Sequence, residues 1–74
     1  MSVERKIKTY LENNGISQAF LSRKTGINSV KLNLSLNENR KLTFGEYELI
    51  CGALNVGVDQ FLSPAIYQSN SEAS

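Results

Sequence analysis

The sequence contains no histidine and a single cysteine, Cys51, among its 74 residues. Without histidine, neither a Ser–His nor a Cys–His pair for nucleophilic catalysis can be assembled, and the common zinc sites lack their ligands. One cysteine cannot form a disulfide within the chain. We therefore expect no enzymatic activity, no bound metal and no cofactor.

Long apolar runs are also missing. The N-terminal residues Met-Ser-Val-Glu-Arg-Lys carry charges with no apolar stretch after them, so we expect no signal peptide, no membrane span and a cytoplasmic protein. Hydrophobic residues make up 41% of the chain and charged residues 20%, which is typical of a folded globular domain. A chain of this length forms one domain, whose small core leaves a stability of about 3–5 kcal/mol.

The net charge is only +1, but it is unevenly distributed. Residues 23–41 carry a net charge of +4, since five basic residues face one acid, Glu38, and the rest of the chain carries −3. A basic segment of this kind is what contact with nucleic-acid phosphates requires. Its basic residues are Arg23, Lys24, Lys31, Arg40 and Lys41.

The stretch from Ser17 to Leu36 has the pattern of two helices joined by a tight turn. Ser17 is placed to cap the first helix, Gly26 to end it in the left-handed conformation, and Asn28 to cap the second. Because the connection is so short, the helices must cross steeply. This is the geometry of a helix-turn-helix, whose second helix enters a DNA groove.

The second of these helices has a competing interpretation, because residues 30–37 alternate between apolar and polar as a half-buried strand does. A strand followed by two helices would be a ribbon-helix-helix protein. We favour the helix, since a strand would have no partner within the chain and leucine prefers helices. In a helix Leu32 and Leu36 face inward, whereas Val30 and Leu34 face outward.

The remaining helices are predicted from their ends. The first spans residues 3–13, begins at a Ser2 cap and stops before a turn at Gly15. Another begins at a capping box formed by Thr43 and Glu46 and runs to residue 54, with Asn55 as its left-handed cap. Its inward stripe contains Tyr47, Ile50, Cys51 and Leu54, widened by Leu49 and Ala53.

A short last helix over residues 58–62 is expected to cover the core with Phe61 and Leu62. From residue 64 the composition turns to small and polar residues, which indicates a flexible tail over residues 64–74. The predicted domain thus comprises residues 1–63.

These motifs, in this order and spacing, resemble the Cro/CI-like (XRE) helix-turn-helix family. The resemblance covers residues 7–62 and is carried by four runs: Ser-Gln-Ala from residue 17 with Gly-Ile at 26, Lys-Leu-Asn-Leu from 31, Arg-Lys-Leu-Thr from 40, and Ala-Leu-Asn-Val from 53 with Asp-Gln-Phe-Leu at 59. It implies an all-α, compact five-helix, lambda-repressor-like domain. Members commonly bind double-stranded DNA as dimeric repressors.

Ser35 departs from this family pattern, which usually has a larger apolar residue on the inner side of that helix. We expect either that neighbours such as Phe20 fill the space or that the helix packs loosely. If a void is present, Ser35→Val should raise the stability by about 1 kcal/mol through added apolar burial.

The resemblance also implies which residues touch DNA. Residues at or beside the base-contacting positions of such repressors are Asn28, Ser29, Val30, Asn33 and Leu34. Residues expected to hold the DNA backbone are Ser17, Gln18, Lys31, Asn37, Arg40 and Lys41. An asparagine amide can read adenine, whereas an apolar side chain can touch only a thymine methyl group.

We expect a homodimer on an inverted repeat and no small-molecule ligand. The apolar residues available for the dimer interface are Leu49, Val58, Phe61, Ile66 and Tyr67. An alternative remains open, because Val30 and Leu34 on an exposed face are also what a protein-interaction module would present to a protein partner.

Overall fold

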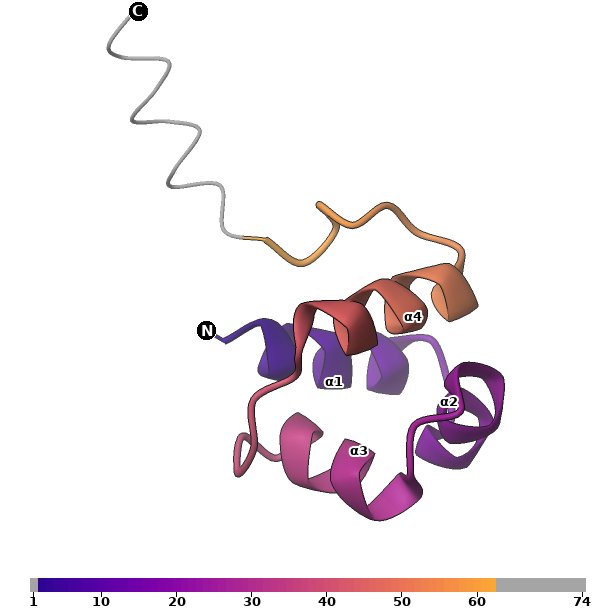
Figure 1. Cartoon of the computed structure of the whole chain (residues 1–74). Helices are drawn as coiled ribbons and strands as arrows, with labels where there is room; N and C mark the ends of the chain where they lie inside the picture. The colour runs from indigo at the N-terminus through magenta and orange to yellow at the C-terminus, as the bar shows by residue number, and fades with distance from the viewer. Residues whose placement is uncertain (1, 63–74) are drawn as a thin grey trace, which may run out of the picture.

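The computed structural model describes residues 2–62, which contain four helices and no strand: α1 (Val3–Asn13), α2 (Gln18–Thr25), α3 (Ser29–Leu36) and α4 (Phe44–Leu54). The all-α fold is confirmed, and the alternating segment is helical as predicted. Figure 1 shows α3 below α1 and α4, with α2 at one end, and the helix pairs in substantial contact are α2 with α4, α2 with α3 and α1 with α3. The predicted tail at residues 64–74 lies outside the described residues.

Each helix begins directly after the residue predicted to cap it. The hydroxyl of Ser2 accepts the backbone N–H of Arg5, and that of Ser17 accepts the backbone N–H of Phe20. Helix ends also follow the prediction: Gly26 and Asn55 adopt left-handed conformations, with φ of 77° and 59°. These contacts satisfy backbone groups that a helix leaves without partners at its ends.

The predicted fifth helix is wrong, because residues 58–62 form turns. The backbone N–H of Gln60 bonds to the carbonyl of Gly57 at 3.1 Å, and that of Leu62 bonds to the carbonyl of Asp59 at 3.2 Å. The carbonyl oxygen of Val58 accepts a hydrogen bond from the Tyr47 hydroxyl, so a side chain of α4 holds this segment in place. The described chain therefore has four helices where the family resemblance implied five.

One apolar cluster holds the four helices and this segment together. The ring of Phe61 packs edge-on against Tyr10 at 5.5 Å and against Tyr47 at 6.4 Å between centroids. Leu62 was expected to cover the core, and Leu49 to widen the inward stripe of α4, but both are exposed. The buried members are Ile7, Leu11, Leu21, Ile27, Leu32, Leu36, Tyr47, Ile50, Cys51 and Phe61.

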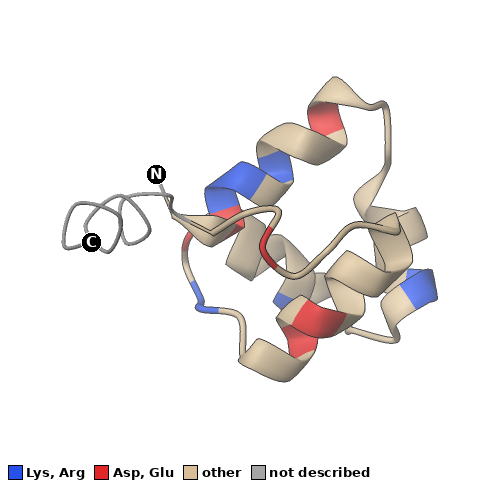
Figure 2. Cartoon of the chain, turned by 90° about the horizontal axis from the view of Figure 1, so that it is seen from above, with Lys and Arg blue, Asp and Glu red and all other residues tan. Residues whose placement is uncertain are grey.

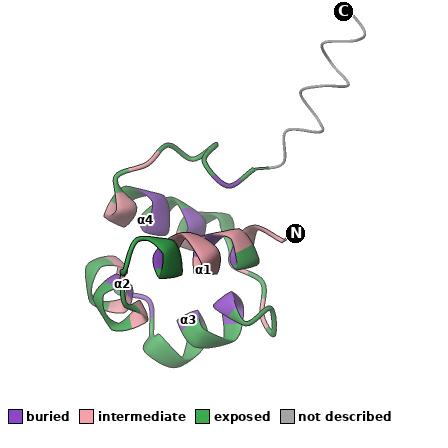
Figure 3. Cartoon of the chain, turned by 180° about the vertical axis from the view of Figure 1, so that it is seen from behind, coloured by how far each residue is buried: buried purple, intermediate pink, exposed green. Residues whose placement is uncertain are grey.

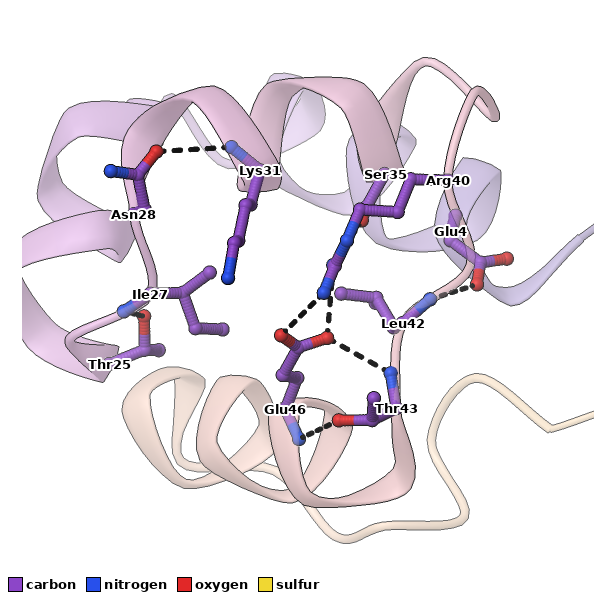
Figure 4. Close-up of polar contacts among 10 residues, drawn as sticks. All are labelled: Glu4, Thr25, Ile27, Asn28, Lys31, Ser35, Arg40, Leu42, Thr43 and Glu46. Carbon is purple, nitrogen blue, oxygen red and sulfur yellow. Dashed lines mark hydrogen bonds and ion pairs between the residues drawn. The ribbon is translucent and has the colours of Figure 1, made fainter.

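Ser35 is fully buried on the inner side of α3, and an arginine occupies the space beside it. Arg40 donates from Nη1 to the Ser35 hydroxyl at 3.0 Å and forms two further hydrogen bonds with the Glu46 carboxylate, at 3.0 and 2.9 Å (Figure 4). Phe20 is exposed, so it does not fill this space. Neither expected alternative, filling by Phe20 or loose packing, describes this site, which is a polar cluster whose buried groups are hydrogen-bonded.

This arrangement reverses the expected effect of Ser35→Val. Valine would remove an acceptor from the Arg40 guanidinium and crowd it, so we expect the free energy of unfolding to fall by about 1 kcal/mol. Urea denaturation measures the change, and Ser35→Ala separates the lost hydrogen bond from the added volume. A valine variant more stable than wild type would show that apolar burial outweighs the hydrogen bond.

No helix within residues 2–62 combines the length and the apolar character needed to cross a bilayer.

Candidate nucleic-acid interface

The turn between α2 and α3 is fixed by side chains of α2. The Ser22 hydroxyl donates to the carbonyl of Ile27 at 2.6 Å, and the Thr25 hydroxyl accepts the N–H of Ile27 at 3.2 Å while donating to the carbonyl of Leu21 at 2.8 Å. Both backbone polar groups of Ile27 are therefore bound to α2, and its side chain is buried in the core. This locks the angle at which α3 leaves the turn.

In this orientation, one face of α3 is exposed to solvent. Val30 is 66% exposed and Leu34 40% exposed, whereas Leu32 and Leu36 are fully buried, as predicted. Figure 3 shows exposed residues along the outer side of α3, which no other described helix covers. Ser29, Asn33 and Asn37 are also exposed around this face.

Asn28 lies at the start of this face, but its carbonyl group is already occupied. The side-chain Oδ1 accepts the backbone N–H of Val30 at 2.8 Å and that of Lys31 at 3.3 Å (Figure 4 draws the second). An amide oxygen has two acceptor sites, and both are used for capping. Asn28 retains only its amide N–H groups for a ligand.

A chain of side-chain amides crosses the interface from α2 to α1. Asn33 donates from Nδ2 to Gln18 Oε1 at 3.2 Å, Asn37 donates from Nδ2 to Asn33 Oδ1 at 3.3 Å, and Lys8 donates from Nζ to Asn37 Oδ1 at 2.8 Å. We call these four residues the amide relay. It joins Gln18 and Asn37, both predicted to hold the DNA backbone, to Asn33, predicted to contact a base.

Lys8 was not predicted to belong to this interface. Lys8 and Asn37 are 29 positions apart and belong to different helices, so no local pattern connects them. The only signal in the sequence was the placement of Lys8 on the polar face of the first helix.

The predicted phosphate-contacting residues fall into two groups. Ser17, Lys31 and Lys41 are exposed, Asn37 is exposed within the amide relay, and Gln18 is half-buried at the first turn of α2. Arg40 differs, because its guanidinium is directed toward Ser35 and Glu46, as Figure 4 shows.

The ion pair with Arg40 also changes the acidity of its partner. The guanidinium and the backbone N–H of Thr43 both bind the Glu46 carboxylate and lower its pKa to about 2. The carboxylate also completes the capping box of α4, since the Thr43 hydroxyl accepts the N–H of Glu46. Glu46 thus links the start of α4 to the inner side of α3.

Two acidic residues near the interface are engaged in contacts between α1 and the loop that follows α3. Glu38, the one acid of the basic segment, accepts from the Ser2 hydroxyl at 2.6 Å and pairs with Arg5 at 3.5 Å, and these contacts lower its pKa. Glu4 is buried and accepts the backbone N–H of Leu42 at 3.0 Å, which ties the loop before α4 to α1. Figure 2 shows basic residues on α1, α2, α3 and this loop, and only acidic ones on α4.

Comparison with known families agrees with this geometry. A model of the Cro/C1-type HTH DNA-binding domain matches residues 6–64, which is most of the chain. No curated protein and no solved structure matches it significantly.

Proposed function

Because the chain belongs to the Cro/C1-type helix-turn-helix DNA-binding family, we propose that it is a sequence-specific transcriptional repressor that inserts α3 into the major groove as a dimer. The observation that carries the proposal is the outer face of α3, which is exposed and held at a fixed angle by the contacts of Ser22 and Thr25 to Ile27. A repressor of this kind would act in the cytoplasm, where it meets its operator.

In this proposal the apolar and the polar side chains of α3 make different kinds of contact with DNA. Val30 and Leu34 have no hydrogen-bonding atoms, so they would contact thymine methyl groups, while Ser29 and Asn33 would hydrogen-bond to base edges. Asn28 contributes through its amide N–H groups alone, because its oxygen caps α3. The residues assigned to phosphates are Ser17, Gln18, Lys31, Asn37 and Lys41.

Arg40 is assigned a different role from the one expected from the sequence. Its side chain is only 27% exposed and its guanidinium forms a bidentate pair with Glu46, so its charge is compensated within the domain. We propose that it supports α3 from the inner side by hydrogen bonding to Ser35 and does not contact a phosphate.

Dimerisation is proposed because α3, with eight residues, reads only a few base pairs. Leu49 and Val58 are exposed, at 52% and 46%, and remain candidates for the interface. Phe61 is withdrawn as a candidate, since it is buried in the core, while Ile66 and Tyr67 lie outside the described residues. Two copies of α3 would enter half-sites about 34 Å apart.

Selection of bound sequences from random duplex DNA tests the proposal. We expect an inverted repeat whose half-sites are one helical turn apart. A selected site without inverted symmetry would contradict the dimer, and failure to select any sequence would contradict specific DNA recognition.

The exposed apolar pair also supports a second candidate function, a module that binds a protein through Val30 and Leu34. The two functions differ in what Leu34 touches. Among the four bases, thymine alone carries a methyl group on its major-groove edge. Removing the methyl group of one thymine therefore tests a single contact of Leu34.

We expect replacement of the contacted thymine by deoxyuridine to weaken binding by about 1 kcal/mol, the value of one buried methyl group. Leu34→Ala should weaken binding to the thymine site and add little further loss on the deoxyuridine site. Titration of both proteins with both duplexes gives the coupling energy. Additive losses would place Leu34 outside the base-reading surface, and an unchanged DNA affinity with loss of a protein partner would favour the interaction module.

A further inference from the structure

The hydrogen bonds of the amide relay all run in one direction, from Lys8 through Asn37 and Asn33 to Gln18. Lys8 determines this direction. An ammonium group has three donors and no acceptor, so the side-chain atom of Asn37 that faces Lys8 Nζ at 2.8 Å must be its oxygen. The NH2 group of Asn37 then faces Asn33, whose oxygen accepts it at 3.3 Å. The NH2 group of Asn33 is left to face Gln18 Oε1, at 3.2 Å.

Without Lys8 this direction is not unique. Side-chain amides present oxygen and nitrogen in nearly equivalent positions, so Gln18, Asn33 and Asn37 can all rotate by half a turn and keep the same number of hydrogen bonds among themselves. Only a partner that donates without accepting, at one end of the relay, distinguishes the two directions. Lys8 is that partner among the described residues.

The direction decides on which side of the Asn33 amide its donor and its acceptor lie, and exchanging them would exchange the positions that a ligand meets. Within the relay its amide uses one N–H and one acceptor site, which leaves one N–H and one acceptor site free. The major-groove edge of adenine presents an acceptor at N7 and a donor at N6, which match this pair. Guanine presents two acceptors there, N7 and O6, so it does not match the Asn33 oxygen.

Asn28 does not offer the same pair. Its oxygen accepts two backbone N–H groups at the start of α3, so it has no acceptor for the adenine N6 amino group. Among the two asparagines predicted to contact bases, only Asn33 has both kinds of atom available.

We propose that Asn33 reads an adenine and that Lys8, acting through Asn37, is a positioning residue that fixes the orientation of the Asn33 amide. The inference rests on the proposed function and adds to it the base read at this position and a specificity determinant on α1. Lys8 itself touches no base in this proposal.

Charge reversal at Lys8 provides a sharp test, because glutamate accepts without donating. In Lys8→Glu the NH2 group of Asn37 would turn toward residue 8, and the amides of Asn33 and Gln18 would turn with it. The matched control is Lys6→Glu, which makes the same charge change on α1 at a residue outside the relay. Lys8→Arg preserves a donor-only side chain and should behave as wild type.

The measured quantity is the affinity for a duplex with adenine at the contacted position divided by the affinity for the same duplex with guanine there. The contacted position is the one at which Asn33→Ala no longer distinguishes between bases. We expect this ratio to fall about tenfold in Lys8→Glu, the order of one bidentate base contact, and to be unchanged in Lys6→Glu and Lys8→Arg. Substituting 7-deazaadenine, which lacks the N7 acceptor, should weaken wild type and leave Lys8→Glu nearly unaffected.

Each other outcome has a definite meaning. Equal losses for adenine and guanine sites in Lys8→Glu and Lys6→Glu would make Lys8 a general electrostatic contributor and overturn the positioning role. An Asn33→Ala variant that selects the same sequence as wild type would overturn the adenine contact. If wild type binds no duplex DNA at all, the proposed function fails as well, whereas binding without this coupling overturns the further inference alone.

Discussion

Replacing Glu46 by alanine is expected to lower the free energy of unfolding by about 3 kcal/mol, the sum of a lost helix cap and lost hydrogen bonds to a charged group. The Glu46 side chain is 19% exposed, accepts two hydrogen bonds from Arg40 and accepts the backbone N–H of Thr43. A domain of this size has a total stability of about 3–5 kcal/mol, so about 0–2 kcal/mol would remain and the variant should be only marginally stable at room temperature.

Glu48→Ala is the matched control for this prediction. Glu48 is exposed on the same helix, and its loss changes the net charge by the same amount. Urea denaturation of both variants should show a large loss for Glu46→Ala and a change within about 0.5 kcal/mol for Glu48→Ala. Equal losses would mean that the charge of α4, and not the contacts of Glu46, determines the stability.

The low pKa of Glu46 gives the same prediction a pH dependence. Arg40 holds the folded-state pKa at about 2, below the ordinary value of 4.5, so the carboxylate stabilises the folded state above pH 4.5. This contribution is lost as the pH falls from 4.5 toward 2, because the Glu46 carboxylate of the unfolded chain binds a proton in this range while that of the folded protein stays ionised. The difference in stability between wild type and Glu46→Ala should therefore narrow over this range, and a constant difference would contradict the ion pair as its source.

Raising the salt concentration from 50 to 200 mM is expected to weaken DNA binding by about 150-fold. Lys31 and Lys41 are the two exposed cations assigned to phosphates, so a dimer would neutralise about four phosphates and give a slope of about −3.6 in a plot of log affinity against log salt concentration. A basic segment that only faces solvent would give no such slope.

Lys31→Met should reduce this slope to about −1.8, because both copies in the dimer lose a contact. Lys24→Met is the control, since it removes the same charge from the last turn of α2, where no phosphate contact is proposed. Filter binding at four salt concentrations gives both slopes. A slope near zero in wild type would favour the protein-interaction module over the repressor.

The bounds of the four observed helices could be predicted from the residues at their ends. A capping side chain binds a backbone N–H two or three residues ahead, as Asn28 and Thr43 do, so the information lies within a few residues of the chain. The burial of Leu32 and Leu36 and the exposure of Val30 and Leu34 also follow from helical periodicity alone. With these, the free face of the candidate site could be predicted without a structure.

The predicted last helix shows where periodicity stops being sufficient. Turns and a short helix can both bury a single apolar residue such as Phe61, so residues 58–62 fit either interpretation. The burial of Phe61 was predicted, but the conformation that achieves it depends on the hydroxyl of Tyr47, which binds the carbonyl of Val58 from another element.

The contacts between polar side chains of different helices could not be predicted from the sequence. Arg40 looked like a phosphate contact because it belongs to a basic segment, yet it lies against Ser35 and Glu46. Lys8 meets Asn37 from 29 positions away, and Glu4 meets the backbone of Leu42 from 38 positions away. Periodicity and capping depend on neighbours along the chain, whereas these contacts depend on how the packed helices cross, which is fixed only when the apolar core assembles.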